Sequence, residues 1–205
     1  MTKDKFIVYG DSRSGNCYKI KLLCSQLGIA YQWREVDILA GDTRTAEFLA
    51  MNANGKIPLL ALPDGCHLAE SNAILAYLAD GSDLAGSDRF SRAAVLQWMF
   101  FEQYSHEPNI ATSRFIIRYL GSPPDRQAAL EEKRPGGYKA LDVMEQQLGN
   151  NTFIAGSEYS IADIALYAYT HVAHEGGFDL NNYPATRAWL DRVRAMPGHV
   201  PMESD

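Results

Sequence analysis

The stretch FIVYGDSRSGNCYKIKLLCSQLG, residues 6–28, joins a short apolar run to an amphipathic segment through a polar loop. Residues 6–9 are continuously apolar, which predicts a buried strand. From Cys17 onward the apolar residues recur at helical spacing, and Gly28 is typical of a helix end. This stretch therefore predicts a strand, a turn and a helix in succession.

The alternation of strands and helices continues to about Asp80. Apolar runs, threonine capping and turn residues predict five further elements, in order: a strand at 31–37, a short helix at 43–51, strands at 57–62 and 66–69, and a helix at 71–80. The elements thus form a strand–helix–strand unit, a helix, and then two strands and a helix. This is the order of a thioredoxin-like sheet.

The chain from Asp88 onward contains only helical spacing. It predicts helices at 92–104, 126–134, 138–148, 160–173 and 185–196. Residues 81–87 are small and polar, as in a linker. We therefore expect an α/β thioredoxin-like domain at residues 1–80, followed by an all-α helical-bundle domain at residues 88–205.

Composition excludes several classes of protein. The 205 residues carry a net charge of −6, and acidic and basic residues are mixed along the chain, which argues against a nucleic-acid partner. No apolar run approaches the roughly 20 residues that cross a bilayer, so no membrane partner is expected. The three cysteines fit neither a disulfide framework nor the spacing of a zinc site, and we expect no metal. With no signal-type segment at the N-terminus, a reduced, cytoplasmic protein is expected.

Three side chains near the start of the first helix are candidate nucleophiles or donors. Cys17 lies three residues before Ile20 on the apolar face of the helix, so we expect it to be packed. Ser14 lies where the strand passes to the helix, and two interpretations stay open. It either caps the helix, or points its hydroxyl toward an anion at the positive helix end. Ser12 lies farther from the helix and is the weaker candidate.

Over nearly its full length the chain resembles the cytosolic glutathione transferases. The segment SRSGNCYKIK, residues 12–21, resembles the serine-type active-site segment of the theta-, delta- and zeta-like classes. This resemblance implies that Ser14 is the catalytic residue and stabilises the thiolate of glutathione, with Asn16 orienting its hydroxyl or adding a second donor. The cysteine-type beta class has its active cysteine about where Gly15 falls, so Cys17 does not inherit that role.

A second segment, NANGKIPLL at residues 52–60, resembles the family's turn before a cis proline. The resemblance implies a cis bond between Ile57 and Pro58, which lets the backbone of Ile57 pair with a bound peptide as an added strand. It also implies that Lys56 pairs with the glycyl carboxylate of glutathione. In several theta-like enzymes a histidine or glutamine near the position of Thr43 contacts glutathione, and here that contact is missing or replaced.

A third segment, LAESNAILAYL at residues 68–78, places two polar residues where a strand passes to a helix. Read alone, they are a helix cap with an acidic first turn. The resemblance implies that Glu70 accepts the ammonium and Ser71 binds the carboxylate of the γ-glutamyl end. A fourth segment, TFIAGSEYSIADIAL at residues 152–166, carries a capping box of Ser160 and Asp163 with a structural role only.

The helical half is expected to contribute the pocket for the second substrate. Glu102, Ile110 and Arg114 are separated by helical steps and are candidates to line it, although ordinary packing or solvent exposure is the simpler interpretation of each. Pro108 is expected to kink this helix. The family resemblance further implies a homodimer.

The resemblance implies a glutathione transferase that activates the glutathione thiol for attack on small, mostly apolar electrophiles. Glutathione is thus the co-substrate and a small electrophile the second partner. Three alternatives stay open: a glutathione-dependent disulfide reductase or peroxidase, an isomerase on the same scaffold, and a transferase-like protein that only binds partners.

Overall fold

The computed structural model describes residues 5–202, which form two units. One unit holds the chain up to Asp80 together with the residues from Pro197, and the other is Gly81–Met196. The sequence pattern assigned the C-terminal residues to the helical domain, whereas the structure places residues 197–202 on the first unit.

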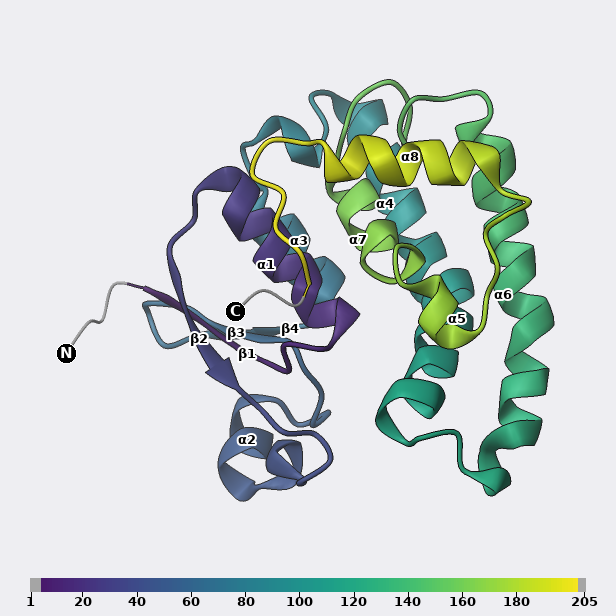
Figure 1. The fold of residues 1–205 in the computed structure, drawn as a ribbon. Coiled ribbons are helices and arrows are strands. Elements are labelled where there is room, and N and C mark those ends of the chain that lie inside the picture. Colours follow the sequence, from purple (N-terminus) through teal and green to yellow (C-terminus); the bar gives the residue numbers. More distant parts are fainter. Residues whose placement is uncertain (1–4, 203–205) are drawn as a thin grey trace. The chain divides into compact units, whose positions relative to one another are not determined.

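The first unit is a four-stranded sheet with helices on both faces (Figure 1). Its elements are β1 Phe6–Gly10, α1 Gly15–Leu27, β2 Tyr31–Glu35, α2 Ala46–Met51, β3 Leu59–Ala61, β4 His67–Ala69 and α3 Ser71–Leu78. The strand order is β2-β1-β3-β4, with β1 parallel to β2 and antiparallel to β3, and β3 antiparallel to β4. Helices α1 and α3 lie on one side of the sheet and α2 on the other. The predicted thioredoxin-like order is confirmed.

The core of this unit follows from the apolar runs. Val8 pairs with Leu60 across β1 and β3, and both side chains are fully buried. The apolar face of α1 is fully buried at Ile20 and Leu23, so the helical spacing faces the core as predicted. Gly28 ends the helix in the left-handed conformation, with φ of 66°, which a glycine adopts at little energetic cost.

The C-terminal segment is tied to α1 by side chains of that helix. The Tyr18 hydroxyl donates to the carbonyl of Val200 at 2.7 Å, and Nζ of Lys21 donates to the carbonyl of Met202 at 3.1 Å. Gly198, with φ of +73°, fits closely, because an added Cβ would lie 2.9 Å from Cα of Gln26. These contacts hold one outer face of α1 in place.

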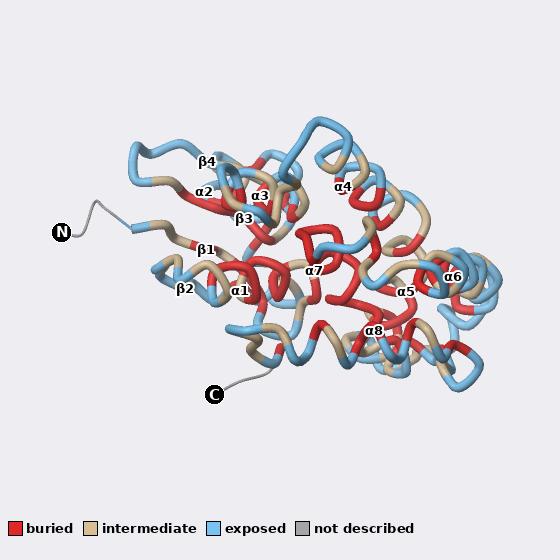
Figure 2. Tube along the Cα trace, turned by 90° about the horizontal axis from the view of Figure 1, so that it is seen from above, coloured by how far each residue is buried: buried red, intermediate tan, exposed pale blue. Residues whose placement is uncertain are grey.

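The second unit is helical throughout its regular elements. They are α4 Arg89–Phe101, a π-helical segment Glu102–His106, α5 Glu107–Arg114, a second π-helical segment Phe115–Tyr119, α6 Gln127–Leu148, α7 Ile161–Thr170 and α8 Pro184–Arg194, with short 3-10 turns between some of them. Every residue of α7 is buried, so this helix is the centre of the unit (Figure 2).

One helix of the second unit differs from the sequence pattern. The segments predicted as separate helices at 126–134 and 138–148 form one helix, α6, with Pro135 inside it. The ring of Phe178 packs against Gly137, where an added Cβ would lie 2.3 Å from the ring, so this close approach needs a glycine.

Pro108 follows a π-helical turn within the long helix, where the sequence predicted a kink. Proline has no N–H to donate to the preceding turn. The turn widens, and the N–H of Glu107 bonds to the carbonyl of Glu102, five residues earlier. The Asn109 side chain then donates to the carbonyl of Ser105 at 2.7 Å. The backbone thus adapts around the proline by inserting a π turn.

The capping box before α7 is confirmed and is part of a buried network. Asp163 Oδ2 accepts from the N–H and the hydroxyl of Ser160 at 2.9 and 3.1 Å. Its Oδ1 accepts from the N–H of Ile154 and from Trp189 Nε1, both at 2.8 Å. Burial raises the pKa of Asp163 to about 6, and these four hydrogen bonds act in the opposite direction.

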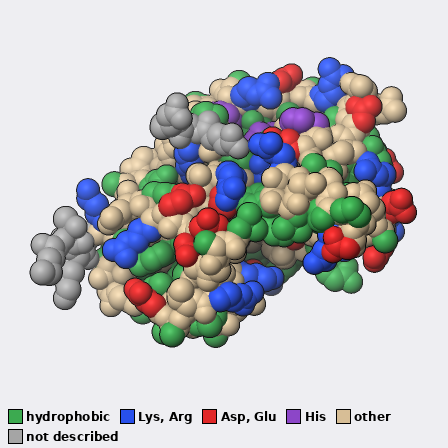
Figure 3. Space-filling model, turned by 60° about the horizontal axis from the view of Figure 1, so that its bottom comes forward, with side chains coloured by type: hydrophobic (Ala, Val, Ile, Leu, Met, Phe, Trp, Pro, Cys, Tyr) green, Lys and Arg blue, Asp and Glu red, His purple; other side chains and the backbone are tan. Residues whose placement is uncertain are grey.

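Charges of both signs are interspersed over the face of the molecule in Figure 3. Within residues 5–202, none of the helices combines the length and the apolar character that crossing a bilayer requires.

Candidate active site

The loop between β1 and α1 is held in one conformation by side-chain hydrogen bonds. Asp11, which is fully buried, accepts from Nε and Nη2 of Arg13 at 3.0 and 2.8 Å. Glu35 accepts from both the N–H and the hydroxyl of Ser12, at 2.8 and 3.1 Å. Gly10 is required here, because an added Cβ would lie 2.8 Å from the ring of Trp33. This loop delivers Ser14 to the helix start in a fixed position.

Ser14 is the residue that immediately precedes α1. Its backbone is extended, with φ of −81°, and its carbonyl accepts from the N–H of Tyr18 at 2.9 Å. Its side chain makes no capping bond to the helix N–H groups, so the simple capping interpretation does not hold. The Ser14 side chain instead acts on Cys17, where it favours the ionised form of the thiol.

Cys17 is fully buried on the apolar face of α1, as its spacing predicted. Burial raises the pKa of its thiol to about 12, and the Ser14 side chain, which acts to lower this pKa, opposes the rise only in part. A thiol with this pKa is protonated at neutral pH and is a poor nucleophile. The Cys24 thiol is protonated at neutral pH for the same reason, since burial raises its pKa to about 12 as well.

The start of α3 meets the start of α1 through a direct hydrogen bond. The Ser71 hydroxyl donates to Oδ1 of Asn16 at 3.2 Å, and Ser71 is only 4% exposed. Glu70 precedes the helix with φ of 69° and ψ of 114°, a conformation that non-glycine residues rarely adopt. Its side chain is exposed and does not cap the helix. Such a strained backbone is typical of binding and catalytic sites.

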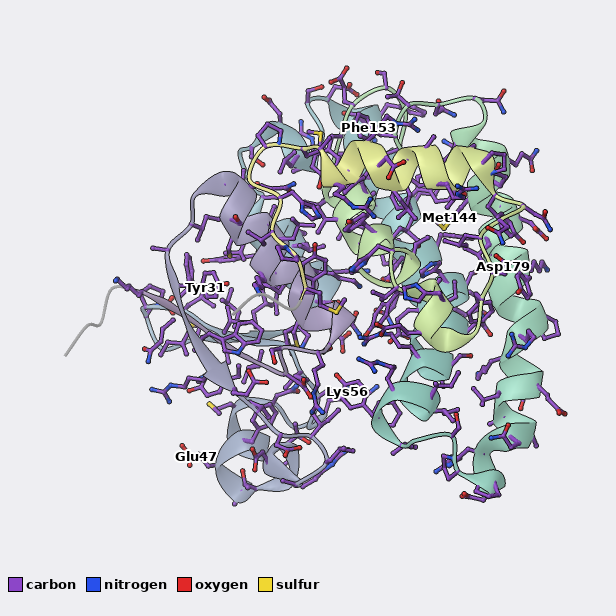
Figure 4. The ribbon with its side chains drawn as sticks, viewed as in Figure 1. Tyr31, Glu47, Lys56, Met144, Phe153 and Asp179 are labelled. Carbon is purple, nitrogen blue, oxygen red and sulfur yellow. The ribbon has the colours of Figure 1, made fainter. Side chains whose placement is uncertain are left out.

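The loop before β3 carries the third group of predicted residues. The bond between Ile57 and Pro58 is cis, as the resemblance implied. The side chain of Lys56, labelled in Figure 4 on the loop between α2 and β3, is exposed. The carbonyl of Lys56 accepts from the Asn52 side chain at 2.8 Å, which holds the loop. Within the described residues, the backbone N–H and C=O of Ile57 take part in no backbone hydrogen bond, so they are open to pairing with a peptide.

Sequence reasoning did not identify two cationic residues of this unit. Arg44 follows Thr43 in a 3-10 turn, and its guanidinium lies against Gly55, where an added Cβ would be 2.6 Å from Nη1. Lys19 lies in α1 and is fully buried, with Nζ 3.2 Å from the Ser71 hydroxyl. Lys19 shares a helix face with Leu22 and Leu23, three and four residues later, which are both fully buried, and this spacing is the signal that could have drawn attention to it.

The candidates for the electrophile pocket are buried within the second unit. Ile110 is fully buried in an apolar cluster with Leu141 and Phe178. Arg114 is 2% exposed, and its Nε donates to Glu175 at 2.7 Å. Glu102 is fully buried in the π-helical segment. All three side chains are at most 2% exposed, so packing inside the second unit accounts for each of them, and their place in an electrophile pocket stays a prediction.

The first unit thus brings two helix N-termini and several polar groups together. The N–H groups and positive dipole ends of α1 and α3 favour anions. Exposed Lys56 and Arg44 beside Gly55 add cationic groups on the loops before β3. Within residues 5–202 no cluster of three or more side chains suited to holding a metal ion occurs. The arrangement fits a small ligand that carries more than one negative charge.

Comparison with known proteins gives consistent matches over the chain. Residues 13–80 match the glutathione S-transferase N-terminal domain, and residues 97–197 match the glutathione S-transferase C-terminal domain. A crystal structure of a glutathione S-transferase from Pseudomonas fluorescens is 60% identical, with a TM-score of 0.95 over 97% of this chain and 99% of that chain.

Two further relatives differ in their described properties. A glutathione transferase family member from Pseudomonas fluorescens, solved with two glutathione molecules bound, is 26% identical, with a TM-score of 0.84 over 97% of this chain and 92% of that one. The disulfide-bond oxidoreductase YfcG of Escherichia coli is 31% identical over 189 residues, or 89% of this chain and 87% of its own. The two domain matches, together with the 60% identity over almost the whole chain, show that this chain belongs to the glutathione S-transferase family.

Proposed function

We propose that this protein is a serine-type glutathione transferase, which binds glutathione on its first unit and activates the thiol for attack on a small electrophile. The observation that carries this proposal is the hydrogen bond between Ser71 and Asn16. It joins the start of α3, suited to the γ-glutamyl end, to the start of α1, suited to the thiol.

Each end of glutathione has a chemically matched group. Ser71 at the start of α3 binds the α-carboxylate, and Glu70 accepts the α-ammonium. The backbone of Ile57 pairs with the cysteinyl part of the peptide, as a strand pairs with a sheet edge. Lys56 and Arg44 bind the glycyl carboxylate. In this assignment Arg44 replaces the contact that relatives make near the position of Thr43.

Ser14 activates the thiol by donating a hydrogen bond to the thiolate. A free thiol with a pKa of about 8.5 is only about 3% ionised at pH 7, and lowering the pKa by two raises this to about three quarters. That change needs about 2.7 kcal/mol. A hydrogen bond to a charged group contributes about 1.5–3 kcal/mol and a helix N-terminus about 0.3–1. Ser14 and the start of α1 therefore suffice without a general base, and Asn16 adds a second donor or orients the hydroxyl.

The resemblance to a disulfide-bond oxidoreductase gives a second candidate function, glutathione-dependent disulfide reduction. Buried Cys17, with its raised pKa, is unsuited to be the redox thiol. Such a reaction would use the thiols of two glutathione molecules, which would be oxidised to glutathione disulfide while the substrate disulfide gains two electrons and two protons.

One set of assays separates these functions. Purified protein is assayed with glutathione and, in turn, a chloronitroarene, an organic hydroperoxide and a small disulfide. We expect conjugation to the chloronitroarene to be faster in the wild type than in Ser14→Ala, with Ser12→Ala as the matched control. Turnover of the hydroperoxide or the disulfide alone would favour the second function, and no turnover of any substrate would favour a protein that only binds partners.

We also propose a homodimer that acts in the cytoplasm. An apolar face of the second unit supports the dimer, because Leu96, Phe100 and Tyr104 are 45%, 70% and 88% exposed. Exposed aromatic residues that cluster on one face are typical of protein interfaces.

A further inference from the structure

We propose that Lys19 is a positioning residue that makes Ser71 an obligate hydrogen donor and so selects a carboxylate at the start of α3. This inference rests on the proposed function, because it concerns the γ-glutamyl end of glutathione. It assigns a role to a residue that neither the sequence pattern nor the fold requires.

The burial of Lys19 is unusual for its residue type. Lysine is almost never fully buried in proteins, yet this side chain has no exposed surface. It extends from α1 to the start of α3, where Nζ lies 3.2 Å from the Ser71 hydroxyl and 3.2 Å from Oδ1 of Asn72. Burying an ammonium is costly, so such a position is expected to serve binding or catalysis more than stability.

The contacts of Lys19 fix the direction of the hydrogen bonds around Ser71. An ammonium group has three donors and no acceptor, so the Ser71 oxygen must accept from Lys19. The one hydrogen of the Ser71 hydroxyl is therefore directed elsewhere, and in this structure it is donated to Oδ1 of Asn16 at 3.2 Å. Lys19 thus holds Ser71 as a donor, and a ligand that binds there must be an acceptor.

The charge of Lys19 acts in the same direction. A carboxylate oxygen bonded to the Ser71 hydroxyl would lie within two hydrogen-bond lengths, or about 6 Å, of Nζ. At this depth the effective dielectric constant is lower than in water, so the attraction between ammonium and carboxylate is stronger. The N–H groups at the start of α3 add to it. A neutral amide at the same place would be attracted less strongly by the ammonium charge. Its NH2 end would also point hydrogens toward the Ser71 hydroxyl, which is itself a donor.

The test compares two ligands, glutathione and its analogue in which the γ-glutamyl α-carboxylate is an α-carboxamide. Dissociation constants are measured by calorimetry for the wild type, Lys19→Met, Lys19→Arg and Lys21→Met. Lys21 is the matched control, because it lies on the same helix and its Nζ bonds to the carbonyl of Met202 instead. We expect the wild type to prefer glutathione at least about tenfold, as for a hydrogen bond to a charged group.

The preference for glutathione is expected to fall at least about fivefold in Lys19→Met, to recover in part in Lys19→Arg and to be unchanged in Lys21→Met. A purely structural lysine would weaken both ligands equally and leave the ratio unchanged, and that result would overturn the inference. If Lys19→Met does not fold, Lys19→Gln replaces it, since glutamine keeps a donor without the charge, and the same fall in the ratio is expected. If the wild type itself does not bind glutathione, the proposed function fails. If the wild type binds glutathione and Lys19→Met keeps the same preference for glutathione over the carboxamide analogue, only this inference fails.

Discussion

The side chain of Ser14 acts to lower the pKa of the Cys17 thiol, so the residue that we propose to stabilise a thiolate already favours the ionised form of a sulfur atom in its own chain. That sulfur is fully buried, and burial raises its pKa to about 12, which keeps it protonated at neutral pH. Ser14 itself is partly exposed. The two residues therefore divide the roles: Cys17 packs the helix, and the Ser14 hydroxyl is the group that a bound thiolate can reach.

Replacing Ser14 by alanine should raise the pKa of enzyme-bound glutathione by about 1 to 2, the equivalent of one hydrogen bond to a charged group. Cys17→Ala should leave that pKa nearly unchanged and lower the thermal stability, because it removes a buried side chain from the apolar face of α1. Thiolate absorbance titrated against pH with glutathione bound measures the first effect, and thermal unfolding the second. Loss of turnover in Cys17→Ala, with a normal thiolate pKa in Ser14→Ala, would reverse the assignment and indicate a cysteine-dependent enzyme.

Two substitutions of Glu70 should separate binding from backbone strain. Glu70→Ala should weaken glutathione binding by about 1.5 kcal/mol or more, roughly tenfold, since it removes the acceptor for the α-ammonium. Glu70→Gly should weaken binding similarly but raise the melting temperature relative to Glu70→Ala, because glycine adopts φ of 69° without strain. Calorimetry and thermal unfolding measure the two effects. Unchanged dissociation constants would show that Glu70 has no part in the site.

The exposed face of α4 should form the dimer contact. Phe100→Glu, which puts a charge at a position 70% exposed in one chain, should shift the mass measured by light scattering from the dimer toward the monomer. Leu39→Glu is the control, because Leu39 is 52% exposed but belongs to the first unit. A wild type that shows only the monomer mass of 22.8 kDa at micromolar concentration would contradict the proposed dimer.

Titration of Asp163 should make stability depend on pH in a direction unusual for an aspartate. The pKa of Asp163 is raised to about 6 in the folded protein from its ordinary value of 3.8, so between these values the folded state holds a proton that the unfolded chain has lost. The contribution of this carboxyl to stability is therefore full below about pH 4 and is lost as the pH rises through about 6.

Asp163→Asn removes this titration and provides the comparison for Asp163. The difference in melting temperature between the wild type and the variant should shrink as the pH rises from about 4 to about 6, and then stay constant. Asp163→Asn should be less stable at every pH, since one end of the amide cannot accept the hydrogen bonds that the carboxylate accepts. A difference that grows with pH in this window would show that the four donors outweigh burial.

Local sequence patterns determined the elements and most of their ends. The apolar run at residues 6–9 and the helical spacing after Cys17 are patterns within a few residues of each other, and they fix periodicity, burial face and caps. For that reason Gly28 and the pair of Ser160 and Asp163 occur at the helix ends where their chemistry predicts them. The candidate residues of the first unit were likewise found from their positions at the ends of strands and helices, with the help of the family resemblance.

Only the tertiary structure decided features that depend on residues far apart in the chain. Helix α6 continues through Pro135, and Phe178, about forty positions later, packs closely against Gly137 in the next turn. Lys19 is buried because it reaches the start of α3, more than fifty residues away, although its residue type predicts exposure. Ile110 and Arg114 show a helical spacing that fits a pocket and a packed interior equally well. The spacing gives the direction of a side chain on its own helix, but burial depends on what the rest of the chain brings against it.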